Sequence, residues 1–279
     1  MTLGSIIIPA YNEQAIILRT LDTLLADAAP DLFEVIVACN GCTDDTAKIV
    51  RSSQHQVEVL ECELAGKAAA IVEAERVATV LPRIYLDADV ELTTQAACAI
   101  LTELANGAIA ARPPAKYLDG DSTFFVRHYW AARQRIPSLS AELCGAGVYG
   151  LSAVARSRFD EFPHVTGDDL FAARIVSADE VTIIDTDPVV VRIPRTVRNQ
   201  LNVLRRVTRG NRQFAAAFPA LAINTTAATR SGLISSCHTV REYFDFAVYA
   251  SFAVAARLLV RLERKPVRWE RDDSTRLVA

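Results

Sequence analysis

Short apolar runs alternate with helix-length segments through the first 112 residues of the chain. The apolar runs are "SIIIP", "FEVIVA", "VEVLE", "RIYLD" and "AIAAR", and helix-length segments at 13–27, 43–53, 67–81 and 93–105 separate them. Runs that are apolar throughout, rather than alternating in polarity, are typical of strands covered on both faces. The pattern therefore predicts repeated β-α units, an α/β fold with a mostly parallel central sheet flanked by helices.

The pattern is less regular from residue 113 onward. It predicts a helix at 122–135, a glycine-bearing turn in "CGAGVYG", and strands in "EVTIID" and "PVVVRI". After Ile193 the chain becomes helical and rich in arginine, and a last helix is expected at 240–264. We therefore expect one domain in two halves, 1–112 and 113–194, followed by a helical C-terminal extension at 195–279.

Polar residues follow the predicted strands of the first half. The segments after three of the strands read "PAYNE", "CNGCTDD" and "DADVE". Ligands of open α/β sheets bind outside the carboxyl ends of the strands, so a binding site is expected at this edge.

Two carboxylates, Asp87 and Asp89, stand at the end of the strand "RIYLD". Residues i and i+2 of an extended segment lie on the same side, and two carboxylates ~4 Å apart repel by about 4 kcal/mol at an effective dielectric of 20. A hard divalent cation prefers oxygen ligands and removes this repulsion. An Asp-x-Asp in an ordinary surface loop is the alternative, and the position at a strand end favours the cation.

Composition narrows the class of protein. The chain has 279 residues, of which 51% are hydrophobic and 23% charged, as in globular proteins. Net charge is −3, but residues 1–110 carry 16 acidic and 6 basic side chains while residues 111–279 carry 17 and 24. The basic second half would suit phosphates, anionic lipid or a partner protein, although solvated helix faces explain it equally.

Other features of the sequence exclude several classes. The N-terminus "MTLGSIIIPAYNE" has no secretory pattern, so the six cysteines are expected as reduced thiols and no structural zinc site is expected. Neither a Gly-x-Gly-x-x-Gly nor a Walker-type loop follows the first strand, which disfavours dinucleotide or ATP chemistry. We expect a cytoplasmic protein with no nucleic-acid partner.

The last predicted helix leaves three interpretations open. Its longest charge-free run, 246–256, has 11 residues against the ~20 needed to span a bilayer. Apolar residues recur at i+3 and i+4 in one stripe: Phe244, Val248, Phe252, Ala255, Leu259 and Leu262. This stripe could pack on the core or form a homodimer, or, with neighbouring arginines, make peripheral contact with the inner face of the plasma membrane.

Five segments in order resemble the inverting glycosyltransferases of family 2, which have the nucleotide-sugar-binding GT-A fold. They are "IIIPAYNE", "VIVACNGCTDDT", "GKAAAIVEA", "YLDADVEL" and "TGDDLFAARI", within roughly the first 180 residues. The resemblance implies a GT-A-type fold and an enzyme that moves one sugar from a nucleoside diphosphate sugar to an acceptor hydroxyl. A UDP-sugar is favoured and a GDP-sugar is the alternative.

The resemblance also implies residues that bind the donor nucleotide. These are Pro9, Ala10, Tyr11, Glu13, Asn40, Lys67, Asp87 and Ala88. Glu13 could instead be an acid in the first turn of a helix, and Lys67 an exposed lysine at a helix start. Many members have Asp where Asn40 stands, so the identity of the base stays open.

For the chemical step the resemblance implies a metal and a base. Asp89, with Asp87, would bind Mn²⁺ or Mg²⁺ across the donor diphosphate, and Asp169 would be the general base, with Asp168 as the alternative. Acceptor-side glycines map to Gly145 and Gly147. Possible diphosphate contacts, which a solvated helix face explains equally, are Arg206, Arg209 and Asn211.

The expected activity is therefore that of a metal-dependent hexosyltransferase in polysaccharide or glycolipid biosynthesis. The Gln-x-x-Arg-Trp motif of polymerising members is absent, which favours transfer of a single sugar. The acceptor would be a glycan, a lipid-linked intermediate or a small metabolite. Two alternatives stay open: a retaining transferase with the same fold, and a non-catalytic nucleotide-sugar-binding protein.

Overall fold

The computed structural model describes residues 2–63, 66–136, 141–222 and 237–263. The chain forms two compact units. We call the first, Met1–Tyr117 with Leu143–Val191, the sheet unit, and the second, Leu118–Glu142 with Arg192–Leu277, the helical unit. By packing, the helix expected at 122–135 belongs with the C-terminal helices, while the expected division at 112 and 194 stays a prediction.

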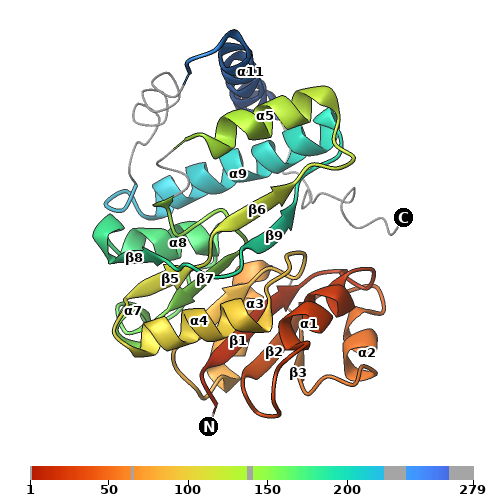
Figure 1. The fold of residues 1–279 in the computed structure, drawn as a ribbon, viewed down its shortest axis with the longest axis vertical. Helices are drawn as coiled ribbons and strands as arrows, with labels where there is room; N and C mark the ends of the chain where they lie inside the picture. Colours follow the sequence, from red (N-terminus) through yellow and green to blue (C-terminus); the bar gives the residue numbers. More distant parts are fainter. Residues whose placement is uncertain (1, 64–65, 137–140, 223–236, 264–279) are drawn as a thin grey trace. The chain divides into compact units, whose positions relative to one another are not determined.

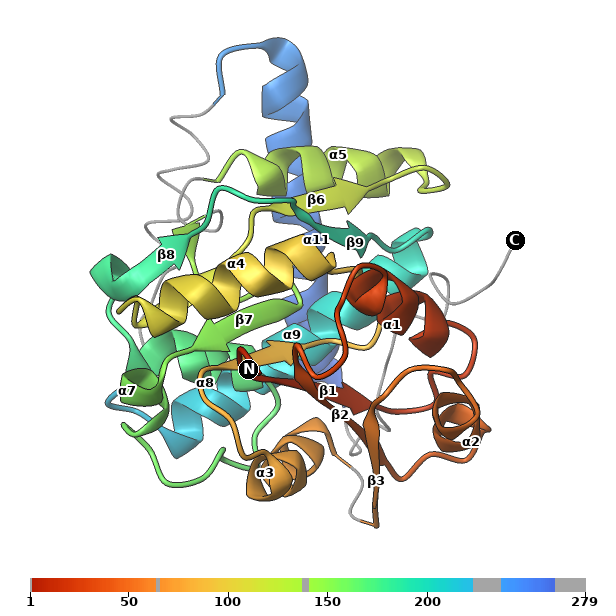
Figure 2. The same ribbon diagram turned by 60° about the horizontal axis from the view of Figure 1, so that its bottom comes forward.

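A seven-stranded sheet forms the centre of the sheet unit, in the order β3-β2-β1-β4-β7-β5-β8 (Figures 1 and 2). The first four strands along the chain are parallel: β1 (Ser5–Ala10), β2 (Glu34–Asn40), β3 (Glu58–Cys62) and β4 (Arg83–Leu86). Three further strands complete it: β5 (Ala110–Arg112), β7 (Val148–Leu151) and β8 (Val181–Ile183). The sheet is mostly parallel, as predicted, and a separate two-stranded sheet pairs β6 (Ala115–Leu118) with β9 (Val189–Arg192).

Helices cover both faces of the central sheet, which is why its strands are apolar throughout. On one face, Ile6 and Ile8 of β1 share a buried cluster with side chains of α1 (Ile17–Leu25), α2 (Thr46–Arg51) and α4 (Thr94–Ala105). On the other face α3 (Lys67–Val77) packs on β1 and β2. There the Phe162 ring contacts both Tyr85 of β4 and Phe171 of α8 (Asp168–Ile175). The short helices α7 (Ala153–Arg156) and η1 (Ala178–Glu180) complete this unit.

The segment "CGAGVYG" turns at Gly145 and Gly147, as predicted, and its last residues begin strand β7, which the sequence analysis missed. Strand β7 runs antiparallel between β4 and β5, with Tyr149 opposite Tyr85. Gly150 weakens the strand signal in the sequence, since glycine is depleted in strands. A Cβ at Gly150 would lie 2.7 Å from Cγ2 of Ile100 and 2.8 Å from Cδ1 of Leu104, so glycine lets α4 approach the sheet closely.

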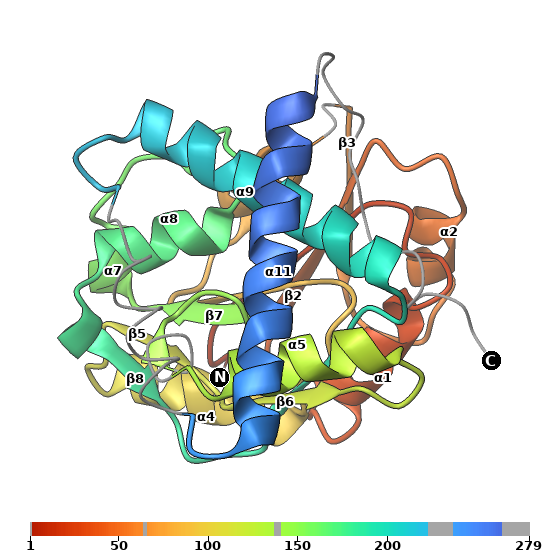
Figure 3. The same cartoon turned by 90° about the horizontal axis from the view of Figure 1, so that it is seen from above.

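Three long helices make up most of the described helical unit: α5 (Phe124–Gln134), α9 (Val197–Ala217) and α11 (Val240–Leu262). Helix α11 packs against both α5 and α9, which Figure 3 shows from above. Asp245 of α11 is buried, accepts a hydrogen bond of 2.6 Å from Nη2 of Arg135 and contacts His128 of α5. This buried ion pair links α11 to α5. The expected end of the helix at residue 264 lies outside the described residues.

Candidate active site at the carboxyl edge of the sheet

The carboxyl ends of β1, β2 and β4 meet at one edge of the sheet because these strands are parallel. Strand β7 runs the opposite way, so its amino end reaches the same edge. The backbone N–H of Asp87, directly after β4, donates a hydrogen bond of 2.8 Å to the carbonyl oxygen of Gly147, directly before β7. The sequence pattern predicted a polar edge here, and the structure brings a second chain segment to it.

Lys67 lies between two of the carboxylates predicted at this edge. Its Nζ atom is 2.5 Å from Oδ1 of Asp87 and 2.8 Å from Oδ1 of Asp168. Lys67 is the first residue of α3, and Asp168 is the first residue of α8. Burial favours the neutral amine, but the carboxylates of Asp168 and Asp87 dominate and raise the pKa of Lys67. Lys67 is therefore an ammonium ion that bridges β4 and α8.

The carboxylates at this edge remain crowded despite the lysine. Burial, with repulsion from Asp89 and Asp168, raises the pKa of Asp87 to about 6, although Lys67 acts in the opposite direction. The Asp87 side chain keeps 37% of its surface exposed, so a ligand can reach it. An added cation would stabilise the charged form of Asp87.

Asp168 and Asp169 have different surroundings, although they are neighbours in the chain. The Asp168 side chain is 4% exposed, and its Oδ2 accepts a hydrogen bond of 2.9 Å from the hydroxyl of Tyr149. Asp169 is half-buried and accepts hydrogen bonds from the backbone N–H groups of Gly145 (3.1 Å) and Leu170 (2.8 Å). Burial and the neighbouring Asp168 raise the pKa of Asp169. A raised pKa and partial exposure are the properties of a carboxylate that exchanges protons.

Two glycines shape the segment before β7. Gly147 has φ +71°, and a Cβ there would lie 2.7 Å from Cγ1 of Val90 and 3.3 Å from Oδ2 of Asp87. Gly145 has φ +87° and holds Asp169 through its N–H group. Glycine adopts such backbone angles readily, so both residues let the chain turn closely around the carboxylates.

The residues predicted to bind the donor nucleotide lie at the same edge, but the side-chain amide of Asn40 is hydrogen-bonded within the protein. Its side-chain amide donates to the carbonyl oxygen of Ala10 (3.0 Å) and accepts from the N–H of Gly66 (3.1 Å). Asn40 is 4% exposed, and it joins the ends of β1 and β2 to the start of α3. Glu13 is also buried, and its N–H group donates to Thr46 Oγ1 at 2.8 Å. Pro9, Ala10 and Ala88 are buried, and Tyr11 is half-buried.

Tyr149 is a site residue that the sequence analysis missed. It holds Asp168, and it also stacks on Tyr85 with ring centroids 4.8 Å apart. The signal was present in "VYGL", where tyrosine and valine favour a strand, but the flanking glycines hid it.

The three predicted diphosphate contacts lie on α9 of the helical unit. Arg209 Nη1 is 2.9 Å from Oε1 of Glu263, which also binds Arg205 at 2.6 Å. Asn211 is exposed and Arg206 is half-buried. Their part in binding a diphosphate stays a prediction.

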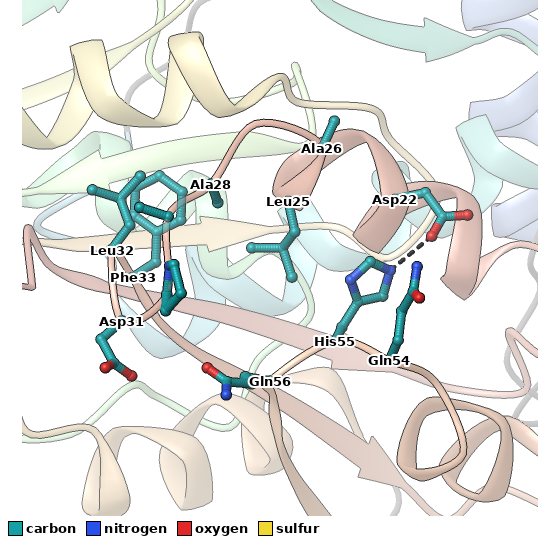
Figure 4. Close-up of a pocket in the computed structure, with 12 residues that line it drawn as sticks. Asp22, Leu25, Ala26, Ala28, Asp31, Leu32, Phe33, Gln54, His55 and Gln56 are labelled. Atoms are coloured by element: carbon teal, nitrogen blue, oxygen red, sulfur yellow. Dashed lines mark hydrogen bonds and ion pairs between the residues drawn. The ribbon is translucent and has the colours of Figure 1, made fainter.

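A separate pocket of about 490 Å³ lies at the opposite edge of the sheet, before the amino ends of β2 and β3 (Figure 4). His55 Nε2 lies 2.7 Å from Asp22 Oδ1 within it. Neither residue lies at the carboxyl edge of the sheet, which holds Asp87, Asp168 and Asp169. The pocket is therefore distinct from the candidate active site.

Comparison with known proteins assigns the family. Residues 5–154 match the family model described as glycosyl transferase family 2, which is more than half of the chain. The chain belongs to glycosyl transferase family 2. Validoxylamine A glucosyltransferase of Streptomyces hygroscopicus subsp. limoneus is 43% identical over 56 residues, which make up 20% of this family 2 chain and 12% of that relative.

Solved structures show the fold of this family 2 chain. Mannosyltransferase PcManGT from Pyrobaculum calidifontis, in complex with GDP-Man and Mn²⁺, has a TM-score of 0.66 at 17% identity, covering 94% of this chain and 87% of that one. TarS 1–349 of S. aureus, in complex with UDP-GlcNAc, has a TM-score of 0.54 at 14% identity, covering 94% and 92%. The fold is of the GT-A type, with a helical C-terminal region.

Proposed function

We propose that this chain is an inverting glycosyltransferase that moves one sugar from a nucleoside diphosphate sugar to an acceptor hydroxyl. The arrangement of Asp87, Lys67 and Asp168 carries the proposal, because it joins a strand end suited to the donor to the helix that bears the base. Membership of family 2 and the GT-A fold support it.

The donor nucleotide would bind along the carboxyl ends of β1, β2 and β4. Tyr11 lies at the surface of this edge, while Asn40 and Glu13 hold the loops that would contact base and ribose. Lys67 would offer its ammonium group to the donor. We favour a UDP-sugar and retain a GDP-sugar, since the two compared structures contain UDP-GlcNAc and GDP-Man.

Asp87 and Asp89 would hold Mn²⁺ or Mg²⁺ together with the donor. No group of three His, Cys, Asp or Glu side chains that could hold a metal ion exists among the described residues. Two carboxylates still fit such a cation, because Mg²⁺ sites commonly use one or two carboxylates plus substrate phosphates. Burial, with repulsion from Asp89 and Asp168, raises the pKa of Asp87, and a cation would favour its charged form. When bound, the metal would stabilise the charge that develops on the departing diphosphate.

Asp169 would act as the general base on the acceptor side. Its carboxylate would take the proton of the acceptor hydroxyl while that oxygen forms a bond to the anomeric carbon. The bond from this carbon to the diphosphate breaks on the opposite face, which inverts the configuration. Gly145 positions Asp169 through its N–H group, and Asp168 positions Lys67. We propose a glycan, a lipid-linked intermediate or a small metabolite as the acceptor, and action in the cytoplasm.

Slow hydrolysis of the donor tests this function without knowledge of the acceptor. The protein is incubated with UDP-glucose, UDP-GlcNAc or GDP-mannose and Mn²⁺, and ¹H NMR records the anomer of the released sugar before mutarotation. The proposal predicts the anomer opposite to that of the donor, and loss of release in Asp169→Asn. Retention of configuration would instead indicate the retaining alternative, and no release from any donor would favour a binding protein.

A further inference from the structure

The exposed apolar surface of the described residues is concentrated in the helical unit. Sixteen large apolar side chains are exposed in the described residues, and twelve of them belong to this unit. Exposed apolar residues scattered singly are ordinary, whereas a contiguous patch marks a surface that contacts something else. Helix α11 carries most of these twelve.

Helix α11 has two apolar sides. Its packed side consists of residues spaced by three or four, which face α5 and α9: Asp245, Val248, Phe252, Ala256 and Val260. On the opposite side lies what we call the exposed stripe, again spaced by three or four: Val240, Phe244 with Tyr243, Ala247, Ser251, Val254, Leu258 and Leu262. Of the stripe predicted from sequence, Val248 and Phe252 are buried while Leu259 and Leu262 are exposed.

The exposed stripe continues onto α5. The ring of Phe244 lies 6.0 Å from that of Phe124, and Phe124 lies 5.4 Å from Phe125. Phe124 and Phe125 are 53% and 51% exposed. Two neighbouring helices therefore present aromatic rings to the same side at the N-terminal end of α11.

The charges of α11 are divided between its two sides. Its three exposed charged residues are all arginines, Arg241, Arg257 and Arg261. Of its two acids, Asp245 is buried in the ion pair with Arg135, and Glu242 caps the start of the helix. No exposed acid of α11 offsets these arginines. An interfacial helix combines an apolar face with basic residues in this way, and the basic residues are attracted to anionic lipid headgroups.

Helix α11 is long enough to cross a membrane, yet its packing opposes crossing. It has 23 residues with a mean hydropathy of 1.5 over an 18-residue window, of which 28% is buried. A crossing helix would place Asp245 and its partners Arg135 and His128 in hydrocarbon, which is strongly unfavourable for charged groups. A helix that lies along the surface keeps this ion pair buried.

We propose that the exposed stripe of α11, with Phe124 and Phe125, binds flat on the surface of a membrane that contains anionic lipids. A second copy of the chain fits less well, because the exposed charges of α11 are all arginines and two copies would offer each other no exposed acid on this helix. Anionic headgroups complement these arginines. The inference rests on the helical unit alone and holds whichever sugar the site transfers.

Cosedimentation with vesicles tests the proposal on the full chain. Vesicles of phosphatidylcholine alone are compared with vesicles that are half phosphatidylglycerol, at low ionic strength. We expect at least about tenfold stronger binding to the anionic vesicles. Val254→Glu and Leu258→Glu should reduce this binding by about tenfold or more, and Arg257→Glu should reduce it on anionic vesicles only.

A matched control separates the stripe from general surface effects. Val154→Glu makes the same substitution at a valine of nearly equal exposure, 56% against 53% for Val254, but in the sheet unit. Its vesicle binding should equal that of the parent protein, and circular dichroism should show each variant folded. Absence of binding to anionic vesicles overturns the proposal, as does equal loss in Val154→Glu. A dimer that Val254→Glu dissociates would show that a second copy of the chain covers the stripe instead. Resistance of the bound protein to alkaline carbonate extraction would show that α11 spans the membrane instead.

Discussion

Lys67 forms an ion pair with Asp87 in which Nζ and Oδ1 are 2.5 Å apart. The pair joins the first residue of α3 to the residue that follows β4, and the same ammonium group reaches Asp168 of α8. A single side chain thus connects the strand end proposed for donor binding with the helix proposed for acceptor activation. The first two predictions concern the residues that hold this arrangement together.

Replacement of Lys67 should impair both halves of the site. In Lys67→Met the carboxylates of Asp87 and Asp168 lose their shared counter-ion, so the pKa of Asp87 should rise. We expect kcat/KM for donor hydrolysis to fall by about 100-fold or more, which corresponds to about 2.7 kcal/mol. Steady-state kinetics with the best donor measures this. Lys116→Met, at an exposed lysine, is the control, and a change of less than twofold in Lys67→Met would contradict the role.

The hydroxyl of Tyr149 should matter through Asp168 rather than by contact with substrate. Tyr149→Phe removes one buried hydrogen bond and leaves an acceptor oxygen without this donor, so unfolding free energy should fall by about 1–3 kcal/mol. Denaturant unfolding gives this value. The rate constant kcat should fall moderately while the acid limb of the pH profile keeps its position. Full stability in Tyr149→Phe would show that the bond is dispensable.

The pH dependence of turnover should report Asp169. A general base acts only when deprotonated, and burial with Asp168 raises the pKa of Asp169, so activity should decline as pH falls at a higher pH than for an ordinary aspartate. We expect kcat/KM to be constant above this raised pKa and to fall about tenfold per pH unit below it. Rates of nucleotide release between about pH 4 and 8 test this. An unchanged rate down to the lower limit would exclude Asp169 as the base.

The sequence predicted the strands of residues 1–112 because their signal is local. Apolar runs such as that around Ile6 and Ile8 mark strands covered on both faces, and all five expected in the first half are present. Strand β7 was missed because Gly150 is required by contacts with α4, which are far away in sequence. Helix α1 begins at Ile17 rather than at Glu13, because Asn12 has φ +54° and the carbonyl of Glu13 closes a turn with Ile16 and Ile17.

The acidic edge was predictable from motif order, but its contacts were not. The position of Asp87 after a strand follows from local pattern, whereas the bridge by Lys67 depends on how α3 and α8 pack on the sheet. The part of Asn40 in binding the donor nucleotide stays a prediction, and the sequence did not show that its amide bonds to Ala10 and Gly66. Charged or polar side chains near a strand end can be located from sequence, but their partners come from tertiary packing.

Titration of nucleotide and metal tests the central claim most directly, namely that the acidic edge binds a nucleoside diphosphate through a divalent cation. Calorimetry with UDP and GDP, each with and without Mn²⁺, would be done on the parent protein, Asp89→Asn and the control Asp119→Asn, which changes an exposed aspartate of the helical unit. We predict that one nucleotide binds at least about tenfold more tightly with Mn²⁺, and that only Asp89→Asn removes this gain. Binding that is independent of both Mn²⁺ and Asp89, or no binding of either nucleotide, would contradict the account.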